Sequence, residues 1–348
     1  MQLSSAANPT FLVRLGRLLR CANQNAALVI EALCNRSAVL ADGVHQACPN
    51  AGQVEVAEEI CQLLGPSQLA QLAPRQVPRF VIDRSAPHAL GAELDLDPRA
   101  SWFRGAHEFL PDRYSVHCTL QIHGALLDQL RRARQNPEHE VAHCAESVGA
   151  RSGPHSPGTV SALAPRQVSM AKGVAHLRAA IAALSAISER RLAKLLDPNQ
   201  NNGLPAALVP NPDGNHYGLM VLRYRAAMLV SELSELATPS RSGALRATLA
   251  AGPPRPTEDG DSTGTDSMCD ALQSVLALER YAAVQAMRVR LVMLARMNRR
   301  AAAPAPGDFA QHILGQFDRA GLLPIWDGHK RPHEIETVRR LMVSRPEP

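Results

Sequence analysis

The sequence predicts an all-α fold, a bundle of long helices followed by a small C-terminal helical segment. Of its 348 residues, 45% are apolar but only 3% are aromatic. This composition favours helices, because sheets draw on aromatic and β-branched side chains. In five segments apolar residues recur at spacings of three and four, the period of a helix that buries one face. The longest of them, Asp266 to Arg300, contains neither Gly nor Pro.

The five predicted long helices, in chain order, cover residues 10–35, 115–135, 166–196, 218–237 and 266–300. The fourth has the most regular apolar stripe, which consists of Leu219, Leu222, Ala226, Leu229, Leu233 and Leu236. It should end at Thr238, because Pro239 disfavours helical backbone at the residue before it. The fifth would be about 50 Å long at ~1.5 Å per residue and needs neighbours of similar length. We therefore expect antiparallel helices, with the stripes on the fourth and fifth completed by other subunits.

Turn-forming residues divide the chain into four predicted parts. These are N-terminal helices at 1–64, an irregular connection at 65–113, the bundle core at 114–300 and a C-terminal segment of two short helices at 301–348. Pro, Arg and Asp are frequent in the connection, and AAAPAPGD at 301–308 separates the last part. Within the core, GPPRPTEDGDSTGTD at 252–266 is expected to form a loop.

Composition also excludes several classes of function. The net charge of +5 comes from basic residues that are scattered among acids. No basic run is interleaved with aromatic residues, so we expect no nucleic-acid partner. No apolar run approaches the ~20 residues of a membrane span, so we expect no membrane association.

The cysteines and histidines do not form a metal motif. Seven cysteines are present, and the first four, Cys21, Cys34, Cys48 and Cys61, are too far apart for a paired knuckle. His117 and His123 are six residues apart, a spacing that does not place both on one helix face. We expect no metal site, and reduced thiols in a cytoplasmic protein.

Several short strings occur in the order in which one enzyme family has them. They are IEAL at 30–33, VH at 44–45, GQVEVA at 52–57, DRYSVHC at 112–118, SERR at 188–191, LD at 196–197 and NGLP at 202–205. Together they resemble the aromatic amino acid ammonia-lyases, which include the histidine and phenylalanine ammonia-lyases. The resemblance implies a fumarase/aspartase-like bundle of long helices, a homotetramer and active sites built across subunits.

The resemblance also implies a cofactor that this sequence does not encode. The family deaminates its substrate with a methylidene-imidazolone, which forms from an Ala-Ser-Gly tripeptide. No Ala-Ser-Gly occurs in the 348 residues. In the family register, Met1 and Gln2 fall within a substrate motif that lies after the cofactor. We therefore expect a truncated, C-terminal portion of the fold with no cofactor of its own.

Three residues are carried over from the family as candidate site residues. Tyr114 matches a catalytic tyrosine that positions the substrate, although a structural role as a half-buried tyrosine at a helix start is the alternative. His117 stands where the family has an arginine that clamps the substrate carboxylate, and Gln121 follows in the same motif. An imidazole is only partly charged at neutral pH and lacks the planar fork of a guanidinium. Carboxylate binding by His117 should therefore be weaker than in the family.

Two further positions depart from the family pattern. Pro111 replaces a glutamine, and Thr263 falls where the family has its catalytic glutamate. Acidic residues close by in the sequence, Glu258, Asp259 and Asp261, are alternatives for that glutamate. By contrast, Glu189, Arg190 and Arg191 are retained and are expected to form ion pairs between packed helices.

Three hypotheses of function follow. The first is a truncated or degenerate ammonia-lyase-like protein that serves as a helical, oligomeric scaffold without independent lyase activity. The second is the C-terminal subunit of a split histidine, phenylalanine or tyrosine ammonia-lyase or aminomutase, with the N-terminal half on a separate chain. The third is a binding protein that uses the vestigial pocket for a small aromatic ligand.

Overall fold

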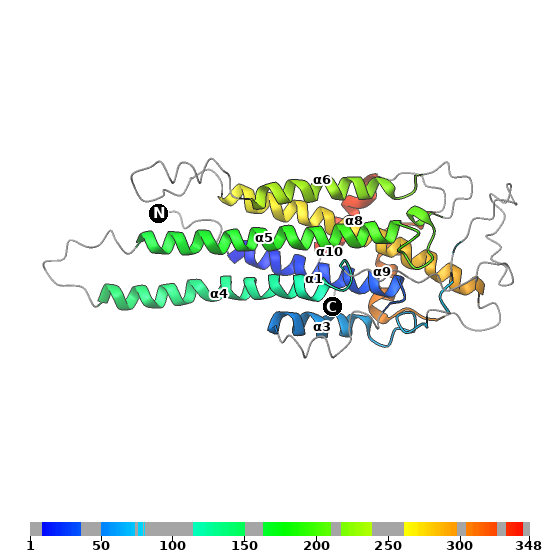
Figure 1. Cartoon of the computed structure of the whole chain (residues 1–348), viewed down its shortest axis with the longest axis horizontal. Coiled ribbons are helices and arrows are strands. Elements are labelled where there is room, and N and C mark those ends of the chain that lie inside the picture. The colour runs from blue at the N-terminus through cyan, green and yellow to red at the C-terminus, as the bar shows by residue number, and fades with distance from the viewer. Residues whose placement is uncertain are drawn as a thin grey trace.

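The computed structural model describes residues 9–35, 50–73, 76–78, 80, 114–149, 163–209, 217–238, 261–297, 304–325 and 332–343. Every regular element in these ranges is a helix, and the long ones run side by side along the molecule (Figure 1). The all-α, long-helix fold predicted from the sequence is thereby confirmed.

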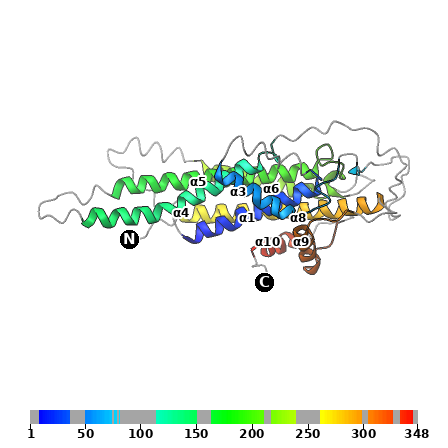
Figure 2. The ribbon, with the colours of Figure 1, turned by 90° about the horizontal axis from the view of Figure 1, so that it is seen from below.

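The long helices are α1 (Pro9–Ala32), α3 (Ala51–Leu64), α4 (Thr119–Gly149), α5 (Leu163–Leu196), α6 (Met220–Ala237) and α8 (Asp261–Met297). A 3-10 turn, η4 (Ala206–Leu208), follows α5, and two short helices, α9 (Asp308–Arg319) and α10 (Pro332–Val343), form the predicted C-terminal segment. In the view turned by 90°, α9 and α10 lie on one side of the long helices (Figure 2).

The predicted loop at 252–266 is wrong for its last six residues, because α8 already begins at Asp261. Thr265 and Met268 in its first turns are buried. This packing compensates for Gly264, which costs about 1 kcal/mol in a helix. Residues 252–260 lie outside the described ranges.

Helix α8 is the central element of the bundle. It packs against α1, α5, α6 and α10, while α4 packs against α3 and α5. Its predicted stripe is almost entirely covered within the chain: Leu272, Leu276, Ala283, Met287 and Leu294 are buried, and Leu291 is half-buried. The expectation that other subunits complete the α8 stripe is therefore wrong, because α1, α5 and α6 cover it.

The leucine stripe of α6 also faces its own chain. Leu219, Ala226 and Leu233 are buried, and Leu222 and Leu229 pack partly buried against the core. For these five residues the expected cover by another subunit is wrong, since α5 and α8 provide it. Leu236, the last residue of the predicted stripe, is exposed, and its cover by another subunit stays a prediction.

Helices α3 and α4 approach each other closely at two glycines, Gly52, which begins the GQVEVA string, and Gly124 of α4. A Cβ atom on Gly52 would clash with the carbonyl oxygen of Gly124. A Cβ atom on Gly124 would lie 2.5 Å from the backbone nitrogen of Gln53. Glycine is required at both positions because the two backbones touch.

Arg290 of α8 is fully buried and joins three loop segments. Its guanidinium donates to the carbonyl oxygens of Ala32 at 3.1 Å and Pro78 at 2.9 Å. It also donates to the carbonyls of Asn201 at 3.3 Å and Asn202 at 2.8 Å. Hydrogen bonds to carbonyl groups thus take the place of a carboxylate partner and fix the end of α1 beside the turn after α5.

Within the described residues, no helix is long and apolar enough to cross a membrane. Five cysteines in these ranges are free thiols: Cys21, Cys34, Cys61, Cys118 and Cys269. The cytoplasmic location stays a prediction.

Candidate functional site

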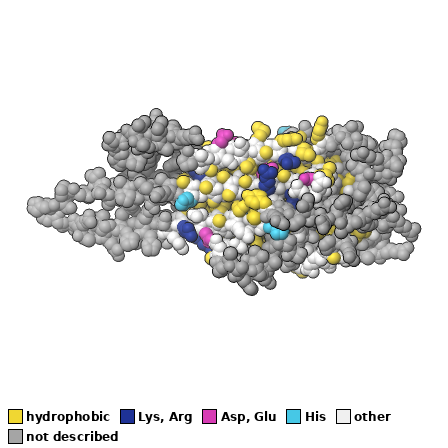
Figure 3. All heavy atoms as spheres, in the orientation of Figure 1, with side chains coloured by type: hydrophobic (Ala, Val, Ile, Leu, Met, Phe, Trp, Pro, Cys, Tyr) yellow, Lys and Arg dark blue, Asp and Glu magenta, His cyan; other side chains and the backbone are white. Residues whose placement is uncertain are grey.

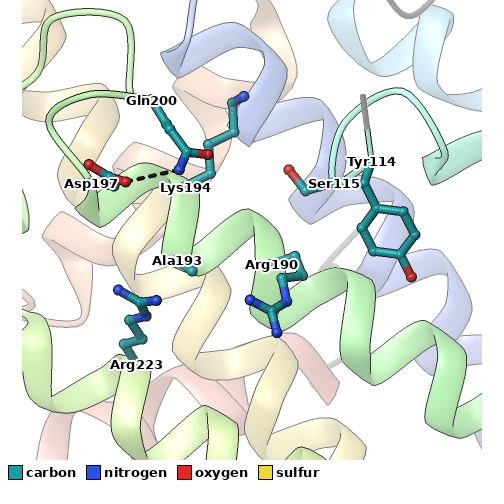
Figure 4. A pocket seen from close by; sticks show the side chains of 8 residues that line it. All are labelled: Tyr114, Ser115, Arg190, Ala193, Lys194, Asp197, Gln200 and Arg223. Atoms are coloured by element: carbon teal, nitrogen blue, oxygen red, sulfur yellow. Dashed lines mark hydrogen bonds between the residues drawn. The ribbon is translucent and has the colours of Figure 1, made fainter. Parts of the chain in front are cut away.

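A small pocket of about 140 Å³ lies at the C-terminal end of α5. Its lining consists of Tyr114, Ser115, Arg190, Ala193, Lys194, Asp197, Gln200 and Arg223 (Figure 4). Tyr114 and Ser115 precede α4, three residues belong to α5, Asp197 and Gln200 follow α5, and Arg223 belongs to α6. The pocket is therefore built from segments that are far apart in the sequence.

Helical spacing explains how these residues come together. Arg190, Lys194 and Asp197 are separated by four and three residues, which places them on one face at the end of α5. Helix α5 packs against both α4 and α6. The start of α4 thereby brings Tyr114 to one end of the pocket, and the first turn of α6 brings Arg223 to the other (Figure 4).

Positive charge predominates in this pocket, with three cationic side chains and one carboxylate in the lining. Asp197 is engaged within its own turn, where Oδ1 accepts from the backbone nitrogen of Asn199 and Oδ2 from Gln200 Nε2, both at 2.9 Å. Arg190 pairs with the neighbouring Glu189 at 3.3 Å. Lys194 is buried in the last turn of α5, where the partial negative charge of the helix end favours a cation.

Of the three residues carried over from the family, only Tyr114 lines the pocket. Gln121 is exposed. It lies seven residues after Tyr114, which corresponds to about 10 Å along a helix axis. His117 is half-buried, and its Nδ1 atom has no hydrogen-bond partner among the described residues. The roles proposed for all three stay predictions. Pro111 lies outside the described residues.

A buried polar network lies next to the pocket, and sequence reasoning anticipated only one of its members, Arg191 of the SERR string. Arg191 and Glu279 are both fully buried, with Arg191 Nε 2.5 Å from Glu279 Oε1. Arg191 Nη1 also donates to Thr119 Oγ1 at 3.1 Å and lies 3.3 Å from His123 Nε2. The ion pair between packed helices expected at the SERR string is thus made by Arg191, from α5 to α8.

His123 extends the network to α1 and α3. Its Nδ1 atom lies 2.6 Å from Asn23 Oδ1, while Asn23 Nδ2 donates to Glu59 Oε2 at 2.7 Å. The imidazole is neutral with the hydrogen on Nδ1, because Nε2 faces the donor Arg191. Burial, together with the charge of Arg191, holds the pKa of His123 well below its usual range.

The network continues on the far side of Glu279. Asn25 Nδ2 donates to Glu279 Oε2 at 3.2 Å, and Arg280 Nε donates to Asn25 Oδ1 at 2.7 Å. These groups lie in the core and connect α1, α3, α4, α5 and α8. The network adjoins the pocket, because Thr119 Oγ1 donates to the carbonyl oxygen of Ser115 at 3.0 Å. Only the SERR string signalled the network, since no local pattern marks His123, Asn25 or Glu279. Its role is to fix how the helices pack.

The family model for aromatic amino acid lyases matches residues 1–306. The chain belongs to the aromatic amino acid lyase family. The resemblance noted in the sequence is therefore confirmed. Histidine ammonia-lyase of Streptomyces avermitilis is 31% identical over 287 residues, which cover 80% of this chain and 48% of that protein. Histidine ammonia-lyase of Geobacillus kaustophilus is 31% identical over 277 residues, 76% of this chain and 45% of the relative. The chain spans about half the length of these curated relatives.

Solved structures of the family share the fold. Histidine ammonia-lyase from Trypanosoma cruzi matches with a TM-score of 0.60 at 20% identity, over 97% of this chain and 55% of that one. The ergothionase from Treponema denticola matches with a TM-score of 0.63 at 18% identity, over 96% of this chain and 57% of that one. At such identities the match concerns the fold alone, which is the ammonia-lyase fold predicted from the sequence.

Proposed function

We propose that this chain is a helical scaffold of the lyase fold that self-associates through α6 and has no lyase activity on its own. This proposal rests on a group of large, exposed apolar side chains at the outside of α6, which consists of Val221, Tyr224 and Met228 on the helix and Tyr217 just before it. We term this group the α6 outer face. Their exposed fractions are 42%, 65%, 74% and 81%.

The spacing of these residues supports an interface. Steps of three and four place Val221, Tyr224 and Met228 on a single line along the helix, opposite the buried Ala226 and Leu233. Tyr217 lies three residues before the helix begins. Helix α6 is therefore apolar on two faces, and a helix of that kind is normally covered on both. Figure 3 shows hydrophobic side chains along the edge of the molecule where α6 lies in Figure 1.

A second copy of this chain is the proposed cover. The resemblance to a homotetrameric family supports self-association. In Figure 1, α6 lies at the edge of the described helices, with α5 and α8 on its inner side. The outer face is therefore placed where a second bundle could pack against it.

The chemistry of the residues supports the lack of independent activity. The family's electrophile forms from an Ala-Ser-Gly tripeptide, and the 348 residues contain none. No residue of this sequence could therefore form the group, and no reaction step is assigned to it. Of the predicted site residues, Tyr114 alone lines the pocket, without His117 or Gln121.

An ultraviolet assay tests the activity directly. Purified protein is incubated with histidine, phenylalanine or tyrosine, and urocanate, cinnamate or coumarate is followed by absorbance. We expect no turnover above a heat-killed control. Clear turnover by the chain alone would contradict the proposal.

A split lyase is the second candidate function, favoured by the position of Tyr114 beside a cationic pocket. In that case the missing electrophile would come from a separate chain. The same assay distinguishes the two candidates, because turnover would then appear only after an electrophile-bearing N-terminal half of a family member is added.

A further inference from the structure

We propose that two copies of this chain pair their α6 helices antiparallel, about a twofold axis that passes beside Met228. The inference rests on the self-association proposed above and specifies how the second copy is placed. In this pair Arg225 lies against the partner's Glu232, and Val221 packs against the partner's Leu236.

The two ends of α6 carry opposite charges. Arg223 and Arg225 lie in its first two turns, whereas Glu232 and Glu235 lie in its last two. All four are exposed except Arg223, which is half-buried. A parallel pair of α6 helices would place like charges at the same height, which is unfavourable. An antiparallel pair places each basic end beside the acidic end of the partner, so the charges favour this direction.

One stripe of α6 determines the register of the pair. Val221, Arg225, Glu232 and Leu236 follow one another at steps of four, seven and four residues, which places them along one edge of the α6 outer face. All four side chains are exposed. In chain order the stripe is apolar, basic, acidic and apolar. Read in the opposite direction it is apolar, acidic, basic and apolar, so an antiparallel copy matches it at every position.

Twofold symmetry closes this pair. Residues 221 and 236 have the same midpoint as residues 225 and 232, between positions 228 and 229. A single axis at that point therefore forms both kinds of contact twice, which is the property of an isologous interface. Met228, which is 74% exposed, lies beside the axis and faces its own copy in the partner. Leu236, which its own chain leaves exposed, gains an apolar neighbour.

Cysteine crosslinking with a short bismaleimide reagent tests the direction and the register, with wild type as the control for the native thiols. Met228→Cys should crosslink to its own copy because it lies beside the axis. Val221→Cys should not crosslink to itself, because its two copies lie about 22 Å apart along the helices. A mixture of Val221→Cys and Leu236→Cys chains should crosslink. The reverse result, with Val221→Cys linked to itself and no product in the mixture, would overturn the antiparallel pair.

Charge reversal tests the ion pairs. Arg225→Glu or Glu232→Arg alone should weaken self-association by roughly tenfold at low ionic strength, because two pairs of opposite charges become pairs of like charges. An equimolar mixture of the two variants should associate as wild type does, since opposite charges face each other again. Arg319→Glu makes the same charge change at an exposed position on α9 and should have no effect. A mixture that does not recover, or an equal loss in Arg319→Glu, would overturn the pairing.

The outcomes separate this inference from the self-association on which it rests. Wild type that stays monomeric at every concentration would refute both and leave the α6 outer face to a different partner. Wild type that associates while Val221→Cys crosslinks to itself would refute the antiparallel pair and leave the scaffold in place.

Discussion

The Nε atom of Arg191 lies 2.5 Å from Oε1 of Glu279, and neither side chain has exposed surface. This ion pair joins α5 to α8 at the centre of the bundle, with Thr119, His123 and Asn25 completing its hydrogen bonds. Because both charges are withdrawn from water, each depends on the other.

Removing both partners of this pair should be less damaging than the two single removals added together. Arg191→Leu or Glu279→Leu alone should lower the free energy of unfolding by about 3–5 kcal/mol, because an unpaired charge stays buried. The double variant should lose less than the sum of the two single losses. Urea unfolding of the three variants measures this, and strictly additive losses would refute the coupling.

Buried His123 should make the fold sensitive to acid. Its pKa in the folded state lies well below the ordinary value of 6.5, so the unfolded chain binds the proton more readily. The neutral imidazole contributes fully to the free energy of unfolding above pH 6.5. This contribution declines as the pH falls from 6.5 towards the pKa of His123 in the folded state.

Two buried carboxyl groups change the stability of the fold with pH in the opposite direction, so their contribution must be separated from that of His123. Burial raises the pKa of Glu31 and Glu59 above 4.5, so acidification through their range favours the folded state. The comparison is therefore between wild type and His123→Gln. The wild-type advantage in melting temperature should shrink as the pH falls from 7 through 6.5, whereas an advantage independent of pH would contradict the assignment.

The contact between α3 and α4 should not tolerate a methyl group. Gly124→Ala would place a Cβ atom 2.5 Å from the backbone nitrogen of Gln53, so the helices must separate and stability should fall. Gly315→Ala in α9 is the matched control, because its Cβ would meet no atom within 4 Å. The control should gain up to about 1 kcal/mol from helix propensity. The melting temperatures of the two variants measure both changes. Equal shifts in melting temperature would refute the close approach of α3 and α4.

The fold could be predicted because apolar periodicity and the family strings are local signals. Leu219, Ala226 and Leu233 mark the buried face of α6 correctly, but a pattern in one helix does not show whether its cover is the same chain or another. The sequence predicts a start of α8 that is five residues too late, because Gly264 is typical of a loop and its packing is not visible in the sequence.

The candidate site was less accessible to sequence reasoning. Tyr114 could be found from its motif, but Arg190 and Arg223 come from two helices whose contact only the structure shows. The same holds for His123, which no spacing relates to Arg191. Sites assembled across helices therefore escape an argument based on one segment at a time.

Self-association through the α6 outer face is tested most directly by light scattering over a range of protein concentrations. Wild type should have a mass above the 37.5 kDa of one chain. The double variant Tyr224→Glu with Met228→Glu, which places two charges in this apolar face, should have the mass of a monomer. Ser234→Glu, an exposed change on the same helix but off that face, should behave as wild type. A wild-type monomer at every concentration, or a double variant with unchanged mass, would contradict the proposed scaffold.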